Sequence, residues 1–153
     1  MGHDAARALA TDIGGGSESA FVEQMNTAAA DLGLAGTHAV NATGLDAPGA
    51  VSTARDMVTV TAVLMNDQAF RAAAVQPTAQ LHGQTFPNTN QLLATYPGAI
   101  GAKTGSTTEA GSCVIAVAER NGRMMTVAVL GASTNQARFD SATKLLDWAF
   151  AQP

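Results

Sequence analysis

Apolar residues in the first two-thirds of the chain recur every three to four positions, which is the spacing of amphipathic helices. Helices are predicted over residues 4–13, 17–33, 52–65 and 67–75. Asp4, Ser17 or Ser19, and Ser52 suit the N-cap positions, because their side-chain oxygens can accept hydrogen bonds from the free N–H groups of a first turn. This part of the chain is therefore predicted to be mainly helical.

The last third of the chain changes to the patterns of β-strands. Strands are predicted over residues 98–105, 112–120 and 123–131, followed by a helix over 136–150. Asn121-Gly122 joins the last two strands, and both residues tolerate the positive φ of a type I′ hairpin turn. Residues 34–51 and 76–98, rich in Gly, Asn, Thr or Pro, are predicted to be loops, with one turn at 90–93.

The order of these elements predicts an α+β fold. Residues 1–97 would be mainly helical, and residues 98–153 would form three antiparallel strands and a C-terminal helix that covers the sheet. A chain of 153 residues is expected to form a single domain, here 1–153. The apolar content of 46% can supply a hydrophobic core, and no apolar run reaches the roughly 18 residues of a membrane helix.

Charge and composition exclude several classes of function. The formal net charge is −4, so the chain lacks the basic field of a nucleic-acid binder, and no such partner is expected. The single cysteine, Cys113, excludes an internal disulfide and is predicted to be a small buried hydrophobe. His3, His38 and His82 lack metal-ligand spacing, with the last two expected on surface loops, so no metal or other cofactor is expected.

The first candidate for chemistry is Lys103-Thr104-Gly105, on a predicted strand. An ammonium beside a hydroxyl and a small residue can hold a carboxylate and leave the backbone open to a substrate. Lysine is scarce in this chain, since Lys144 is the only other one. Taken alone, the motif is better explained as a strand end that carries a solvated lysine.

Short runs along the whole chain match one known family in sequence order. They are Phe21–Asn26, Leu32–Leu34, Thr37–Asn41, Gly44-Leu45, Ser52–Met57, Asn88–Leu93, Gly101–Gly105, Ala110–Cys113, Gly131 and Arg138. In these runs the chain resembles the serine-type D-alanyl-D-alanine carboxypeptidases, which are low-molecular-mass penicillin-binding proteins. The resemblance implies the C-terminal portion of a β-lactamase/penicillin-binding-protein fold. Ala39 departs from it where an aromatic is usual, and Ser106 where a bulkier polar residue is common.

The family uses three motifs, S-x-x-K, S-x-N and K-T-G, and the last is complete here. The resemblance implies that Lys103 and Thr104 bind the terminal carboxylate of a D-Ala-D-Ala stem peptide or a β-lactam. Gly105 would let the substrate backbone lie along the strand. The N–H of Ser106 would be one oxyanion-hole donor. Arg138 would lie near the carboxylate, the alternative being an ordinary helix residue paired with Asp140.

The other two motifs depart from the family pattern. Met1 and His3 take the positions of the serine and asparagine of S-x-N. His3 can supply one hydrogen bond from each ring nitrogen, although a terminal residue is usually mobile and a frayed His3 is the simpler interpretation. Ser141-Ala142-Thr143-Lys144 fits S-x-x-K by its letters but follows the K-T-G motif, whereas the family's S-x-x-K precedes it.

The favoured hypothesis is a D-Ala-D-Ala carboxypeptidase acting on peptidoglycan stem peptides through an acyl-serine intermediate, here as a fragment without its nucleophile. We expect no turnover from this fragment alone. The alternative is a non-catalytic module that binds peptidoglycan stems or β-lactams and keeps the K-T-G motif for recognition. A hydrolase that uses Ser106 or Ser112 is disfavoured, because no base is within reach by sequence.

The remaining expectations concern partners and location. The strand at Arg123–Gly131 would be an unpaired apolar edge, which predicts a dimer, a swapped oligomer or pairing with a complementary N-terminal fragment. Residues Met1–Asp4 lack the features of a signal peptide, and a chain that begins inside an element suggests a fragment. By resemblance the protein would work outside the cytoplasmic membrane, in the periplasm or on the cell-wall side.

Overall fold

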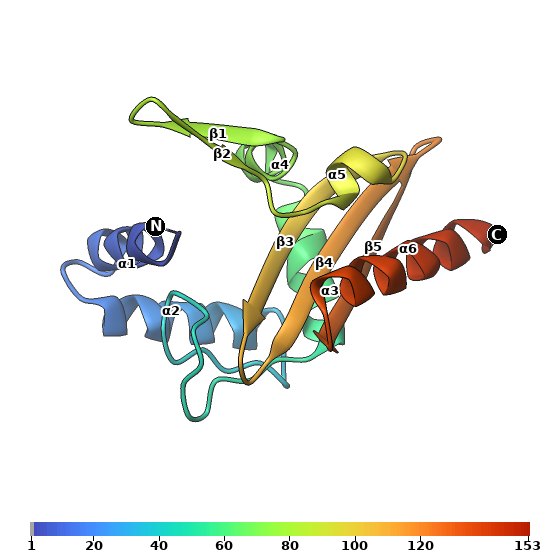
Figure 1. The fold of residues 1–153 in the computed structure, drawn as a ribbon. Helices are drawn as coiled ribbons and strands as arrows, with labels where there is room; N and C mark the ends of the chain where they lie inside the picture. The colour runs from blue at the N-terminus through green and yellow to red at the C-terminus, as the bar shows by residue number, and fades with distance from the viewer. Residues whose placement is uncertain (1) are drawn as a thin grey trace. The chain divides into compact units, whose positions relative to one another are not determined.

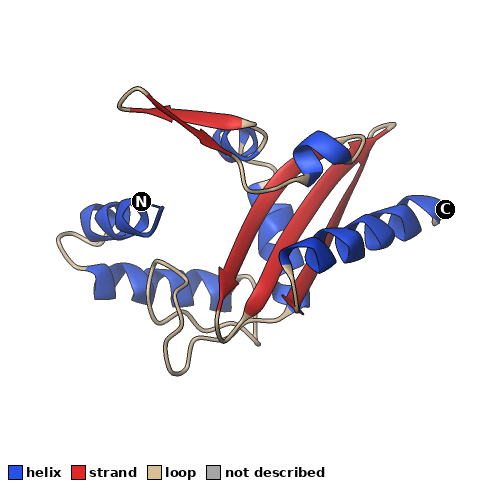
Figure 2. Cartoon of the chain, in the orientation of Figure 1, coloured by secondary structure: helices blue, strands red, loops and turns tan. Residues whose placement is uncertain are grey.

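The computed structural model describes residues 2–153 (Figures 1 and 2), which divide into two compact units, one ending at Thr59 and the other beginning at Val60. The elements are α1 (Gly2–Ile13), α2 (Glu18–Asp31), α3 (Ala54–Leu64), α4 (Gln68–Ala74), β1 (Thr78–Leu81), β2 (Gln84–Pro87), α5 (Leu92–Thr95), β3 (Ala99–Thr107), β4 (Gly111–Arg120), β5 (Arg123–Ala132) and α6 (Asn135–Ala151). The α+β class is confirmed. The expectation of a single domain over 1–153 stays a prediction.

In the first unit, the predicted N-cap of α2 is confirmed, whereas that of α3 is wrong: α3 begins at Ala54, and the side chain of Thr53, not Ser52, accepts from the N–H of Asp56 at 3.1 Å. Ser17 is the N-cap of α2, and its side chain accepts a hydrogen bond from the backbone N–H of Ala20 at 3.3 Å. Arg7 of α1 forms an ion pair with Glu18 of α2 at 3.1 Å. The predicted N-cap at Asp4 is wrong, because α1 already begins at Gly2 and Asp4 lies in its first turn. A carboxylate is favourable there because it faces the positive end of the helix dipole.

Two side chains of the first unit hold the long loop that follows α2. The Asn26 amide donates to the carbonyl of Ala39 at 2.8 Å and accepts from the N–H of Ala39 at 2.7 Å. The buried Asp56 carboxylate accepts from the hydroxyl of Thr37 at 2.7 Å and the N–H of Gly36 at 2.9 Å. The hydrogen bond from Thr37 is the largest cause that lowers the pKa of Asp56, and the bond from Gly36 acts in the same direction. Asp56 therefore organises the loop.

The second unit is built on an antiparallel sheet in the order β3-β4-β5. Asn121 and Gly122 join β4 to β5 with φ of 52° and 73°, as the hairpin signal predicted. Figure 1 shows α6 lying across one face of the sheet, and its apolar side chains pack there on β4 and β5. The core of this layer contains Leu92, Tyr96, Val114, Ala116, Ala118, Val127, Phe139, Ala142 and Leu146.

The prediction of a loop over residues 76–98 is wrong for its first part, because β1 and β2 form a hairpin there. Each strand has only four residues, and nearly all of their side chains are exposed. They therefore carry no apolar alternation for sequence reasoning to detect. Backbone pairing and a turn at His82-Gly83, with φ of 49° and 74°, define this hairpin. The turn expected at 90–93 appears as the short helix α5.

The sheet leaves β5 as an edge strand in the part of the chain that the structure describes. Its ladder runs to β4 on one side only, and Met124 and Leu130 on it are exposed. The predicted unpaired apolar edge is therefore present. Unpaired backbone groups on such an edge can pair with another strand.

Candidate functional site

The K-T-G residues lie on β3, the other edge strand of the sheet. Thr104 pairs with Val114, and Ser106 pairs with Ser112, in the β3–β4 register. Directly paired residues share a face of the sheet, so Thr104 and Ser106 lie on the face that α6 covers. Lys103 and Gly105 alternate with them and lie on the opposite face.

The Lys103 ammonium turns back to the strand and donates to the carbonyl oxygen of Thr104. The positive charge therefore lies beside Thr104. Although the residue as a whole is exposed, the surrounding protein displaces enough water from the ammonium to lower the pKa of Lys103. The positive charge of Arg138 acts in the same direction and is the smaller cause.

The Thr104 hydroxyl has a partner that sequence reasoning missed. Its Oγ1 lies 2.6 Å from Oγ1 of Thr89, which is in the loop between β2 and α5. The two residues are 15 positions apart, and neither a repeat nor a periodic pattern connects them. The only signal in the sequence is the polar run Asn88-Thr89-Asn90.

Arg138 lies near the start of α6 with only 5% of its surface exposed. Its Nη1 donates to the carbonyls of Gly105 at 2.9 Å and Cys113 at 3.0 Å, and to the hydroxyl of Ser106 at 3.1 Å. The alternative pairing with Asp140 is not what the structure shows, because that carboxylate accepts from Gln136 instead. Arg138 therefore supports the strand that carries Lys103 and Thr104.

Gly105 and Ser106 complete the strand segment. A Cβ built on Gly105 would meet no atom within 4 Å, so the space beside this residue is open. Gly101 of the same strand is different, because its φ of 156° and the close approach of Ala74 of α4 make a side chain there strained. The Ser106 side chain is exposed, and besides Arg138 its hydroxyl faces that of Ser112 at 3.4 Å.

The other predicted residues lie elsewhere. His3 is exposed in the first turn of α1, in the first unit, and its role stays a prediction. Met1, the residue at the serine position of S-x-N, lies outside the described residues. Ser141 and Lys144 lie on α6. The expected full burial of Cys113 is wrong, since the residue is half-buried at a β-bulge where its Sγ accepts from the N–H of Gly131 at 3.4 Å.

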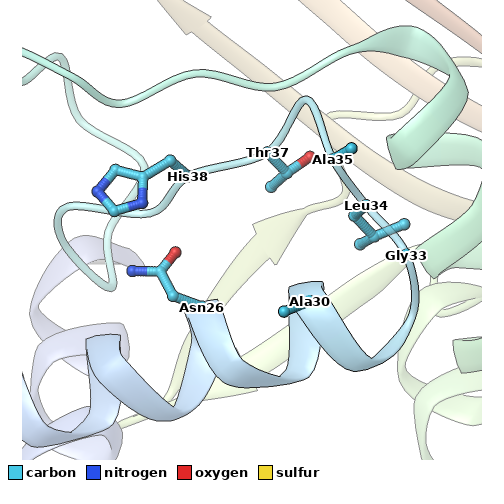
Figure 3. Close-up of a pocket in the computed structure, with 7 residues that line it drawn as sticks. All are labelled: Asn26, Ala30, Gly33, Leu34, Ala35, Thr37 and His38. Atoms are coloured by element: carbon cyan, nitrogen blue, oxygen red, sulfur yellow. The ribbon is translucent and has the colours of Figure 1, made fainter.

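An open hollow of about 410 Å³ lies in the first unit (Figure 3). It is lined by Asn26, Ala30, Gly33, Leu34, Ala35, Thr37 and His38. The Asn26 amide on its wall uses one N–H and one lone pair to hold the backbone of Ala39, which is a structural role in the loop. Within residues 2–153 no three His, Cys, Asp or Glu side chains gather as a metal site would require.

The site thus combines an ammonium and hydroxyl groups on the edge strand β3 with the buried guanidinium of Arg138, which supports β3 and β4 from α6. Backbone groups on a free edge can pair with an extended ligand, and positive charge beside hydroxyl groups favours a carboxylate. The geometry defines a site suited to the C-terminal carboxylate of an extended peptide.

Comparisons with known proteins identify the family to which the chain belongs. The sequence model of the D-alanyl-D-alanine carboxypeptidase family matches residues 1–134. The carboxypeptidase DacB2 of Mycobacterium tuberculosis is 37% identical over 98% of this chain and 54% of that protein. The D-alanyl-D-alanine carboxypeptidase of Streptomyces sp. (strain K15) is 38% identical over 98% of this chain and 57% of that protein.

Solved structures give the same result. The crystal structure of the Streptomyces K15 DD-transpeptidase superposes with a TM-score of 0.91 at 36% identity, covering 97% of this chain and 63% of that one. The carboxypeptidase from Mycobacterium tuberculosis superposes with a TM-score of 0.87 over 98% of this chain and 60% of that one. The chain belongs to the D-alanyl-D-alanine carboxypeptidase family. It spans a little more than half the length of the curated relatives named here.

Replacing Arg138 should destabilise the sheet. In Arg138→Gln the carbonyls of Gly105 and Cys113 and the hydroxyl of Ser106 lose the charged donor that is buried beside them. The free energy of unfolding is expected to fall by about 2 kcal/mol or more, measured by chemical denaturation. Arg123→Gln is the matched control, because the exposed Arg123 donates only near the C-terminus, and about 0.5 kcal/mol or less is expected. Equal losses in the two variants would contradict the structural role of Arg138.

Proposed function

We propose that this chain provides the carboxylate-binding strand of a serine-type D-Ala-D-Ala carboxypeptidase that acts on peptidoglycan stem peptides. The observation that carries the proposal is the placement of Lys103, Thr104 and Gly105 on the free edge of β3, with open space beside Gly105. The family membership and the names of the relatives support the same reaction class.

In this proposal the substrate lies along β3 as an added strand. Lys103 and Thr104 bind the terminal carboxylate through charge and a hydroxyl hydrogen bond. The N–H of Ser106 stabilises negative charge that develops on the scissile carbonyl oxygen. Arg138 holds the Gly105 carbonyl and the Ser106 hydroxyl in place from behind the strand, and adds positive potential at the carboxylate end.

The complete reaction would form an acyl-serine ester, release D-alanine and then hydrolyse the ester. No S-x-x-K run precedes Lys103 in these 153 residues, so the 153-residue chain alone should not turn over substrate. The placement of Lys103 and Thr104 on β3 is equally the basis of a second candidate function, a non-catalytic module that binds stem peptides or β-lactams through these two residues. Intact-mass analysis after incubation with a β-lactam separates these two candidates from a hydrolase that uses Ser106 or Ser112. Only such a hydrolase would form a covalent adduct.

We also propose that the protein works outside the cytoplasmic membrane, because peptidoglycan is there. Among the helices of residues 2–153, none has the length and apolarity to cross a bilayer.

The two lysines provide a matched test of carboxylate binding. Lys103→Met should weaken binding of an N-acetylated peptide ending in D-Ala-D-Ala by roughly 10- to 100-fold, whereas Lys144→Met should leave it unchanged. Calorimetric or NMR titration measures both. A bound anion favours the protonated amine, so affinity should be full below the pKa of Lys103 and fall as the pH rises through it. Because that pKa lies below the ordinary 10.5, the loss should begin earlier than for an exposed lysine. Equal effects of the two variants, or an affinity that does not respond to pH, would contradict the assignment.

Gly105→Ala separates a structural glycine from a functional one. Its φ is not in the left-handed region and its added methyl meets no atom within 4 Å, so stability should change by no more than about 0.5 kcal/mol. The methyl would nevertheless occupy the space where the substrate backbone approaches, and peptide affinity should fall about tenfold or more. A variant that binds the peptide normally would exclude substrate from this side of β3.

We further propose that the free edge of β5 pairs with another strand, from a second copy of the chain or from a complementary N-terminal fragment. Sedimentation velocity of the chain alone is expected to show a dimer or larger oligomer, because the exposed backbone groups and apolar side chains of β5 favour association. A lysine placed at an exposed apolar position of the strand, Met124→Lys, should shift the equilibrium toward monomer. A clean monomer of the unaltered chain, with no added partner, would contradict the self-association.

A further inference from the structure

Thr89 contacts the carboxylate-binding strand without belonging to it. Its Oγ1 lies 2.6 Å from Oγ1 of Thr104, a distance typical of a strong hydroxyl–hydroxyl hydrogen bond. The contact joins the loop after β2 to the middle of β3. Both residues belong to the second unit.

The loop holds Thr89 in place through the two asparagines on either side of it. The N–H of Asn88 donates to the carbonyl of Pro77 at 2.8 Å, and its side-chain amide donates to the carbonyl of Gln76 at 2.9 Å. The Asn88 side-chain oxygen accepts from the N–H of Asn90 at 2.9 Å. Asn90 is only 3% exposed, and its side-chain oxygen accepts from the N–H at the start of α5. Thr89 is therefore a fixed partner for Thr104.

The direction of the hydroxyl bond matters, because each hydroxyl has one proton to donate. If Thr104 donates to Thr89, the Thr104 oxygen presents only lone pairs to an incoming carboxylate, and the contact is repulsive. If Thr89 donates, the Thr104 proton is free to point at the carboxylate. A chain of hydroxyls that ends on an anion also strengthens each bond by polarisation.

We propose that Thr89 is a positioning residue that holds the Thr104 side chain in one rotamer and, by donating to its oxygen, directs the Thr104 proton at the bound carboxylate. This inference rests on the proposed function of Thr104. It adds to the site a residue that touches the ligand only through another side chain.

The first test needs no ligand. Three-bond couplings to the Thr104 methyl carbon report its χ1 rotamer by NMR. Thr104 should occupy one rotamer in the unaltered chain and in Thr89→Ser, which keeps the hydroxyl, but average between rotamers in Thr89→Val, which has the same shape without it. Thr85→Val is the control, because Thr85 bonds Gln80 in the β1–β2 hairpin instead. A single unchanged Thr104 rotamer in Thr89→Val would overturn the proposal.

The second test measures affinity for the acetylated D-Ala-D-Ala peptide. Thr89→Val should lower it about tenfold, and Thr89→Ser should restore it to within about twofold of the unaltered chain. Adding Thr89→Val to Thr104→Val should cost nothing further, because the first residue acts through the second. Independent, additive losses would overturn the proposal. If the unaltered chain binds no peptide, the proposed function fails, and the rotamer test still decides whether Thr89 positions Thr104.

Discussion

The candidate site depends on one buried cation. Arg138 reaches from α6 to the sheet, where its Nη1 donates to two carbonyls and a hydroxyl on β3 and β4. These bonds join the helix to both strands and offset part of the cost of burying the guanidinium, whose Nε is buried without a hydrogen-bond partner among the described residues. The same charge helps to lower the pKa of Lys103, which couples the support of the strand to the electrostatics of its exposed edge.

The two edges of the sheet have opposite characters. On β3, the ammonium, the hydroxyls and the open space beside Gly105 suit a polar, extended ligand. On β5, exposed Met124 and Leu130 lie beside unpaired backbone groups, which suits another strand of protein. A substrate strand and a structural strand would thus add to opposite sides of the same sheet. Pairing at β5 would enlarge the hydrophobic core without blocking β3.

The family membership gives these features a common interpretation. The alignments include nearly all of this chain but little more than half of each curated relative named above. It has the K-T-G motif and its supporting arginine, whereas its sequence holds no S-x-x-K run before Lys103. Under the proposed function, binding and catalysis would be separated along the polypeptide. The strand would supply the recognition of the carboxylate, while an acyl-serine reaction needs a nucleophile and base that these residues do not supply.

The sequence alone determined the local structure and the type of chemistry. Helical spacing defined α2, the Asn121-Gly122 turn defined the β4–β5 hairpin, and the K-T-G run marked the strand that carries the site, because each signal lies within a few neighbouring residues. The β1–β2 hairpin escaped prediction, since its exposed strands have no apolar pattern. Only the tertiary structure showed that Thr89 bonds Thr104 across 15 residues and that Arg138 bonds Gly105 across 33. Such contacts arise from the packing of α5 and α6 on the sheet, and local sequence patterns do not encode that packing.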